Sequence, residues 1–161
     1  MRDFVDKDAC ELLDADHLAV KHLFVEYARL AYAPGAGPNR DRSAIATRIC
    51  NELTVHAEIE EEIFYPALRD AIKETDLLDE AEVEHGTAKD LIAQLEGATE
   101  ADEKFDAKVK VLGEYIDHHV KEERNEIFPK ARANRKLDLV TMRDQLAARK
   151  EELMAEMEAT A

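Results

Sequence analysis

The stretches "HAEIEEEIFYP" at residues 56–66 and "HVKEERNEIFP" at residues 119–129 share one pattern. In each stretch a glutamate follows the histidine by four residues and a proline follows it by ten, and an arginine follows the proline by three. Residues four apart lie one turn apart on the same helix face, so each histidine and its glutamate would project together. The pattern therefore places charge, twice, on the apolar face of a predicted helix.

The composition indicates one soluble helical domain. The 161 residues are 45% hydrophobic and 37% charged, with few glycines and prolines and no tryptophan. The net charge of −15 argues against binding to nucleic acid or to anionic membrane surfaces. No run approaches the ~18 apolar residues of a transmembrane helix, and the N-terminal residues lack the hydrophobic segment of a signal peptide. We therefore expect a cytoplasmic protein.

Apolar periodicity and helix-breaking residues predict the elements. The chain has a break rich in Pro and Gly at 33–39 and a helix stop at Gly97. We therefore expect helices at about 8–32, 40–73, 76–96 and 99–133. A charged amphipathic helix follows within 136–161. Short connections favour an all-α, antiparallel up-down-up-down four-helix bundle with an additional C-terminal amphipathic helix. We assign residues 1–133 to the bundle and 134–161 to an extension that packs on the bundle or on a partner.

Local signals refine two of these helices. Pro66 and Pro129 lie inside predicted helices, which they should kink or tighten. Thr99 with Asp102 resembles a capping box at the start of the fourth helix, with Asp in place of Glu.

Cys10 and Cys50 should lie roughly 20 Å apart in an antiparallel pair at ~1.5 Å per residue, too far for a disulfide. We expect both cysteines to be free and buried.

Each of the four bundle helices places one histidine on its apolar face. His17, for example, lies in line with Leu13, Val20 and Phe24. One buried imidazole is commonly a hydrogen-bonded core residue, but four unrelated ones would multiply the cost of desolvation. Convergence on a metal removes that cost. The inward-facing histidines are His17, His56, His85 and His119.

Two glutamates complete this set. Glu60 and Glu123 lie one turn beyond their histidines on the same faces, where an ionised carboxylate needs a cation. Four imidazoles and two carboxylates suit two ions bridged by the carboxylates. This donor set suits Fe or Mn, whereas a single Zn needs only four ligands.

Other polar residues near the motifs have simpler interpretations. His22 should face outward, about 140° around the helix from His17. The pair His118/Glu122 is an alternative to His119/Glu123 and stays open at this point. Tyr115 is either a core residue or a hydrogen-bond donor to the site. The remaining acidic residues of the motifs are expected to be solvated or to accept an imidazole N–H: Glu58, Glu61, Glu62 and Glu122.

These residues resemble a known family. The inward His17, "HAEIEEEIFYP", "EHGTAKDLIAQL" and "HHVKEERNEIFP" look like the hemerythrin-like (hemerythrin HHE cation-binding) domains over about residues 10–132. The resemblance implies a non-haem di-iron centre with an oxo or hydroxo bridge. Its ligands would be His17, His56, Glu60, His85, His119 and Glu123, with the two glutamates bridging. Oxygen-carrying hemerythrins have a second histidine on the third helix, but here Ala81 and Lys89 flank His85 by one turn.

The missing histidine would leave open positions for a small ligand. We expect a metal-binding protein that binds, senses or reduces O₂, peroxide or NO, so that a redox enzyme is one possibility, although no catalytic residue is assigned. An alternative is iron storage, donation or sensing through a protein partner or a second copy of the chain at residues 136–161. A purely structural bundle is the remote alternative.

Overall fold

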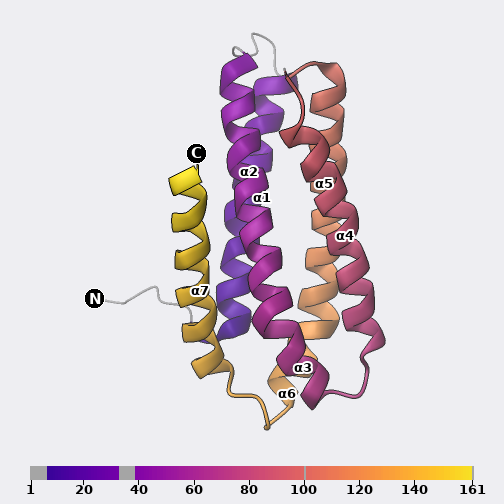
Figure 1. Cartoon of the computed structure of the whole chain (residues 1–161). Coiled ribbons are helices and arrows are strands. Elements are labelled where there is room, and N and C mark those ends of the chain that lie inside the picture. The colour runs from indigo at the N-terminus through magenta and orange to yellow at the C-terminus, as the bar shows by residue number, and fades with distance from the viewer. Residues whose placement is uncertain (1–6, 33–38, 100, 161) are drawn as a thin grey trace, which may run out of the picture.

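The bundle is formed by four long helical segments that run antiparallel to one another, with a further helix along one side (Figure 1). The computed structural model describes residues 7–32, 39–99 and 101–160, and in this part every regular element is helical. The elements are α1 (Ala9–Tyr32), α2 (Asn39–Ile59), η1 (Glu60–Phe64), α3 (Tyr65–Ala71), α4 (Asp76–Glu96), α5 (Glu103–Glu122), η2 (Glu123–Ile127), α6 (Phe128–Ala133) and α7 (Leu139–Thr160). The predicted fold is confirmed.

The four segments pack as a ring. Helix α1 contacts α2 and α5, and α4 contacts the same two helices from the opposite corner. Helices α2, η1 and α3 form one continuous segment, as do α5, η2 and α6 (Figure 1). The short α3 and α6 therefore lie at the same end of the bundle, and each carries its proline in the first helical turn.

Most helix boundaries follow the expected capping signals. The carboxylate of Asp8 accepts a hydrogen bond from the backbone N–H of Glu11 at the start of α1, and α4 ends at Gly97. The predicted capping box at Thr99 is wrong, because Asp102 itself caps α5 by accepting from the Phe105 N–H at 2.9 Å. The predicted break at 33–39 lies mostly outside the described residues.

A π-helical turn precedes each helical proline. The backbone N–H of Tyr65 donates to the carbonyl of Glu60, five residues back, and Phe128 donates to Glu123 in the same way. Proline lacks an N–H and its ring clashes with the carbonyl four residues earlier, so the wider turn removes the clash. The expected tightening was wrong: the helix widens instead. Both π turns begin at the glutamates of the repeated motif.

The apolar core has two clusters, with the histidines between them along every segment. One cluster contains Leu13, Ile59, Ala81 and Ile127, and the other contains Val20, Leu53, Ala88 and Leu112. On each segment the inward histidine lies between a residue of the first cluster and a residue of the second. The polar layer is thus enclosed by apolar side chains on both sides.

The two cysteines belong to different clusters. Cys10 lies in the first cluster and Cys50 in the second, and both thiols are free and buried, as predicted. Burial raises the pKa of each thiol to about 12, so neither is a reactive thiolate at neutral pH. These cysteines act as small apolar core residues.

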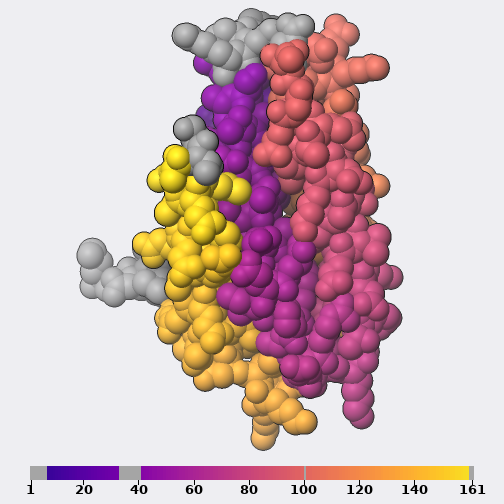
Figure 2. Space-filling view, viewed as in Figure 1, coloured from indigo at the N-terminus to yellow at the C-terminus, as the bar shows by residue number. Residues whose placement is uncertain are grey.

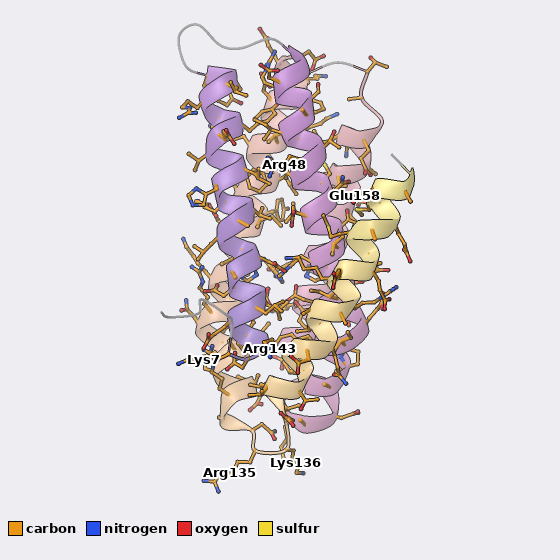
Figure 3. The ribbon with its side chains drawn as sticks, turned by 90° about the vertical axis from the view of Figure 1, so that its left-hand side faces the viewer. Lys7, Arg48, Arg135, Lys136, Arg143 and Glu158 are labelled. Atoms are coloured by element: carbon orange, nitrogen blue, oxygen red, sulfur yellow. The ribbon has the colours of Figure 1, made fainter. Side chains whose placement is uncertain are left out.

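Helix α7 lies against the α1–α2 side of the bundle (Figures 1 and 2). Asp138 caps it by accepting from the backbone N–H of Thr141 at 3.0 Å. Met142 and Leu146 are buried in the first core cluster. In Figure 3, Lys136 lies in the loop that leads into α7 and Glu158 lies near its far end. Among the described helices, none has the length and apolar character needed to cross a bilayer.

Candidate metal centre

The six residues singled out in the sequence meet in the layer between the two core clusters. All four histidines are at most 7% exposed, and Glu60 and Glu123 are fully buried. Their donor atoms form two groups, each of which contains two imidazoles and one carboxylate. Group A is His17, His56 and Glu123, and group B is Glu60, His85 and His119.

In group A the imidazoles come from the adjacent helices α1 and α2. The Nε2 atoms of His17 and His56 are 3.2 Å apart. The Nε2 atom of His17 lies 3.3 Å from Oε1 of Glu123. The Nε2 atom of His56 lies 3.1 Å from Oε1 of Glu60, which belongs to the other group.

Group B repeats this geometry on α4 and α5. The Nε2 atoms of His85 and His119 are 3.2 Å apart, and Oε1 of Glu60 lies 3.3 Å from that of His85. The Nε2 atom of His119 lies 2.9 Å from Oε1 of Glu123. Each glutamate therefore lies against an imidazole of both groups, which is the arrangement required of a bridging carboxylate.

A carboxylate outside the layer orients each imidazole through its Nδ1 atom. The pairs are His17 with Asp14 at 3.1 Å, His56 with Asp16 at 3.0 Å, His85 with Glu61 at 3.0 Å and His119 with Glu84 at 2.7 Å. An Nδ1–H that donates to a carboxylate leaves the lone pair on Nε2, which is the form that binds a metal. All four lone pairs then point into the layer.

The outer carboxyls are held in their ionised form. Burial raises the pKa of Asp14, Asp16 and Glu84, but hydrogen bonds from the imidazoles and nearby positive charges bring each pKa below its ordinary value. For Glu61 the hydrogen bond from His85 is the largest cause of the lowered pKa. These carboxylates can therefore accept Nδ1–H bonds throughout the neutral pH range.

The donor set fits a pair of cations. None of the four oxygens of Glu60 and Glu123 receives a well-formed hydrogen bond, although all are buried. Buried ionised carboxylates without partners are strongly unfavourable, and facing Nε2 lone pairs add repulsion. Cations placed between the nitrogens and the carboxylates remove both costs.

Without a cation, protons take over part of this role. Burial lowers the pKa of His56, but the charge of Glu60 and the hydrogen bond to Asp16 outweigh it and raise the pKa to about 10. The pKa of His119 is likewise raised, since the carboxylate of Glu123 outweighs burial. The metal-free layer is therefore expected to carry protons that a metal would displace.

The structure separates the two candidate His/Glu pairs of α5. His119 and Glu123 project into the layer, whereas the side chain of His118 is 64% exposed and lies 3.1 Å from Glu122. His22 is exposed, as predicted. Glu61 was expected to be solvated or to accept an imidazole N–H, and its contact with His85 confirms the second interpretation.

Replacing His119 should abolish one metal position, whereas replacing its neighbour His118 should not. Loss of an outer partner typically costs about 10–100-fold in metal affinity, so loss of the ligand His119→Gln is expected to exceed that range. The matched control His118→Gln alters an exposed imidazole that supplies no donor to the layer and reaches it only through Glu84, at 3.4 Å. Metal content after dialysis checks this prediction, and metal loss in His118→Gln alone would contradict it.

Sequence reasoning missed Tyr65, which is the tyrosine at the site. Its hydroxyl lies 3.4 Å from Nε2 of both His85 and His119, and the residue is 1% exposed. Tyr115, which was expected to be core or a donor, is instead 43% exposed and lies beside the site. The repeated motif could have indicated Tyr65 as a site residue, because Tyr65 and Phe128 occupy the same position of the motif, immediately before the proline.

Three outer carboxylates were also missed: Asp14, Asp16 and Glu84. Asp14 precedes His17 by three residues, so its contact is local. Asp16 and Glu84 each precede a histidine directly but reach across to the histidine of another helix. An acidic residue just before the inward histidine of the first and third helices is the signal that would have found both.

Known proteins share the sequence pattern and the fold of this chain. The family model of the hemerythrin HHE cation binding domain matches residues 8–131. A hemerythrin HHE cation binding domain-containing protein from Mycobacterium kansasii has the same fold, with a TM-score of 0.75 at 24% identity, over 92% of this chain and 88% of the other. A DNA nickase from Nostoc sp. is 28% identical over 129 residues, which are 80% of this chain but only 35% of that protein.

The buried His/Glu layer inside a four-helix bundle defines a metal-binding protein. The chain belongs to the hemerythrin HHE cation binding domain family. It spans about a third of the length of the curated relative that it matches.

Proposed function

We propose that the protein is a non-haem di-iron protein that binds, senses or reduces a small oxidant such as O₂, peroxide or NO. The observation that carries this proposal is the layer of four Nε2 atoms around the four unbonded oxygens of Glu60 and Glu123. His17 and His56 would hold one ion and His85 and His119 the other, with the two glutamates shared. Imidazole with carboxylate suits iron, which would supply binding of the small ligand and electron transfer.

A narrow cavity beside the layer supports a small ligand. Its volume is about 30 Å³, and it is bounded by the inward imidazoles and by apolar side chains. Space for one water molecule is about 10–15 Å³, so a cavity of this size favours a diatomic molecule or a peroxide over a larger ligand. The apolar residues that line it are Val20, Leu53, Ala57, Ala88, Ile92, Ile116 and Val120.

The two groups differ in the aromatic residue beside them. The ring of Phe128 stacks on His17 in group A, with centroids 6.1 Å apart, while Tyr65 lies against His85 in group B at 5.5 Å. If Nε2 of His85 and His119 bind a metal, the Tyr65 hydroxyl needs another acceptor inside the layer. A carboxylate oxygen or a bound small ligand can accept that bond, so we assign Tyr65 as the donor of group B.

Lys89 distinguishes the chain from oxygen-carrying hemerythrins. It occupies the position one turn after His85, and its ammonium group donates to Glu61 at 2.7 Å instead of facing the layer. No described residue on α4 adds a second imidazole to His85. We therefore favour sensing or reduction of the ligand over reversible oxygen carriage.

Metal analysis of the freshly purified protein, with its near-ultraviolet and visible spectrum, tests the metal part of this proposal. About two irons per chain are expected. Stopped-flow mixing of the reduced protein with O₂, peroxide or NO then tests the ligand part. Absence of iron, with no uptake on anaerobic reconstitution, would sink the proposal, and a loaded protein without a spectral response to any of the three would sink its second part.

Replacing Tyr65 by phenylalanine makes the two groups alike and should slow the reaction without removing metal. One hydrogen bond contributes about 0.5–1.5 kcal/mol, so the reaction of the reduced protein with peroxide should slow by up to about tenfold. Iron content should stay at the wild-type value. Phe128→Leu, which alters the matching position of group A, is the control and should not change the peroxide rate in this way. An unchanged rate in Tyr65→Phe would contradict the role of the hydroxyl.

We do not extend the nicking of DNA to this chain. The related nickase matches over 35% of its length. The net charge of −15 opposes approach to the phosphate backbone. Iron storage, donation or sensing remains the second candidate, and the observation that favours it is the contact of Lys150 on α7 with Asp16, the carboxylate that orients His56.

A further inference from the structure

Each outer carboxylate is itself paired with a basic side chain. The pairs are Asp14 with Arg124 at 2.5 Å, Glu61 with Lys89 at 2.7 Å, Glu84 with His118 at 3.4 Å and Asp16 with Lys150 at 2.5 Å. The first three basic residues belong to the bundle. Lys150 belongs to α7, so one imidazole of group A depends on a helix outside the bundle.

Asp16 connects α7 to the layer. Its Oδ2 accepts from Nδ1 of His56 at 3.0 Å and its Oδ1 accepts from Nζ of Lys150 at 2.5 Å. The residue is 6% exposed, so water does not replace a lost partner at full strength. Removal of Lys150 would leave a buried charge with one oxygen unpaired, which makes the position of the Asp16 carboxylate against His56 less stable.

The neighbouring residue of α7 contacts the η1 turn, which adjoins the layer. The guanidinium of Arg149 donates to both carboxylate oxygens of Glu62, at 2.9 and 3.3 Å. Glu62 lies in the η1 turn, two residues after Glu60. Two adjacent basic residues thus fasten α7 to α1 and to η1.

The contacts of Arg149 and Lys150 matter because fully buried apolar side chains hold only the N-terminal part of α7. Its buried side chains, Met142 and Leu146, lie in the first two turns. From residue 147 to residue 159 no side chain is fully buried, and Leu153 is only partly covered. Arg149 and Lys150 therefore add polar contacts to a half of α7 that is otherwise held by partly covered side chains such as Leu153, Met154 and Met157.

We propose that Lys150 is a positioning residue, through which docking of α7 holds Asp16 on His56 and strengthens retention of the ion of group A. Binding free energies are reciprocal, so an ion in group A also tightens the docking of the C-terminal half of α7. Group B depends on Lys89 within the bundle instead. This inference rests on the two-ion site proposed above, and it makes α7 a reporter of metal occupancy.

The test compares iron release from matched variants. Protein loaded anaerobically with ferrous iron is mixed with the chelator ferrozine, whose colour follows each ion as it leaves. In Lys150→Met one of the two ions should leave faster by up to about tenfold, because loss of the direct partner of a ligand costs ~10–100-fold and Lys150 acts through such a partner. Lys150→Arg should release both at the wild-type rate. Lys21→Met, which breaks the exposed ion pair with Asp117, is the control for loss of a lysine charge.

Hydrogen exchange of α7 provides the second readout. In the wild type, iron loading should slow exchange at residues 149–159, and in Lys150→Met this effect should disappear. Lys89→Met should speed the release of one ion while the effect of iron on α7 is kept, since Lys89 does not contact α7. A merely structural role of Lys150 predicts equal acceleration of both ions instead.

The outcomes separate this inference from the proposed function. Wild-type protein that takes up no ferrous iron would overturn both. Two ions that leave Lys150→Met at the wild-type rate, or that both leave faster to the same extent, would overturn the inference alone. If iron loading does not change hydrogen exchange of α7 in the wild type, the inference is also overturned. That measurement uses the wild-type protein alone, so it does not depend on the folding of a variant.

Discussion

Glutamine at both Glu60 and Glu123 is expected to abolish metal loading. The two carboxylates supply the only charged donors that the structure places between the four described imidazoles, and glutamine keeps their size while removing both charges. Without these charges two ions would face each other with neutral ligands alone, and their repulsion would be unscreened in the buried layer. We expect metal content at background level in the double variant.

Thermal unfolding provides an independent measure of the same loss. A ligand that binds only the folded state stabilises it by about 2.7 kcal/mol when its free concentration is 100 times Kd. Added iron should therefore raise the Tm of the wild type and leave the Tm of the double variant unchanged. Glu126→Gln is the control, because Glu126 lies in the same η2 turn as Glu123 but is exposed. Two ions retained by the double variant would refute the assignment of the bridging residues.

The metal-free protein is expected to lose stability as the pH rises above neutrality. The carboxylate of Glu60 and the hydrogen bond to Asp16 outweigh burial and raise the pKa of His56 from 6.5 to about 10. A raised pKa means that protonation favours the folded state. The resulting stability is fully present below the unfolded pKa of 6.5 and is lost as the pH approaches 10. The raised pKa of His85 and of His119 acts in the same direction.

Chemical denaturation at pH 6 and pH 8.5 checks this expectation. The pKa of Glu60 is lowered because His56 outweighs burial, so Glu60 is ionised throughout this interval and adds no slope. The cysteines, with a pKa of about 12 in the fold and 9.0 outside it, act mainly above the interval. A second measurement is proton release: metal added near pH 7 to the weakly buffered, metal-free protein should acidify the solution. Binding without acidification would contradict the protonated layer.

The fold could be predicted because its signals are local. Apolar spacing, Gly97 and the inward histidines define helices and faces without knowledge of the tertiary structure. The shared level of His17 and His56 follows from the antiparallel arrangement, because the two histidines have a similar number of residues between them and the connection of α1 to α2. Whether those positions hold a metal is a prediction that the metal analysis tests.

The parts that could not be predicted depend on contacts between helices. Asp16 reaches His56 across forty residues and is held by Lys150 from α7. Nothing in the local pattern around Asp16 specifies either partner. Tyr65 enters the layer because the preceding π turn rotates it inward, whereas a regular helix from Glu60 would direct Phe64 there. Proline in a helix predicts a disturbance but does not specify its form.

The π turns have a consequence for the length of the chain at these points. Each π turn holds one residue more than a regular helical turn, so it acts as an insertion of one residue. The helix has absorbed this residue, and the part after the proline still shows the same face to the core. Removal of one residue from Glu60–Phe64 would return the backbone to a regular helix. The segment before the deletion and the segment after it would then stay in phase, while the ring of Pro66 would meet the carbonyl that then lies four residues before it. The extra residue thus works as a spacer, which reconciles a proline with an uninterrupted packing face at the point where the carboxylate must project inward.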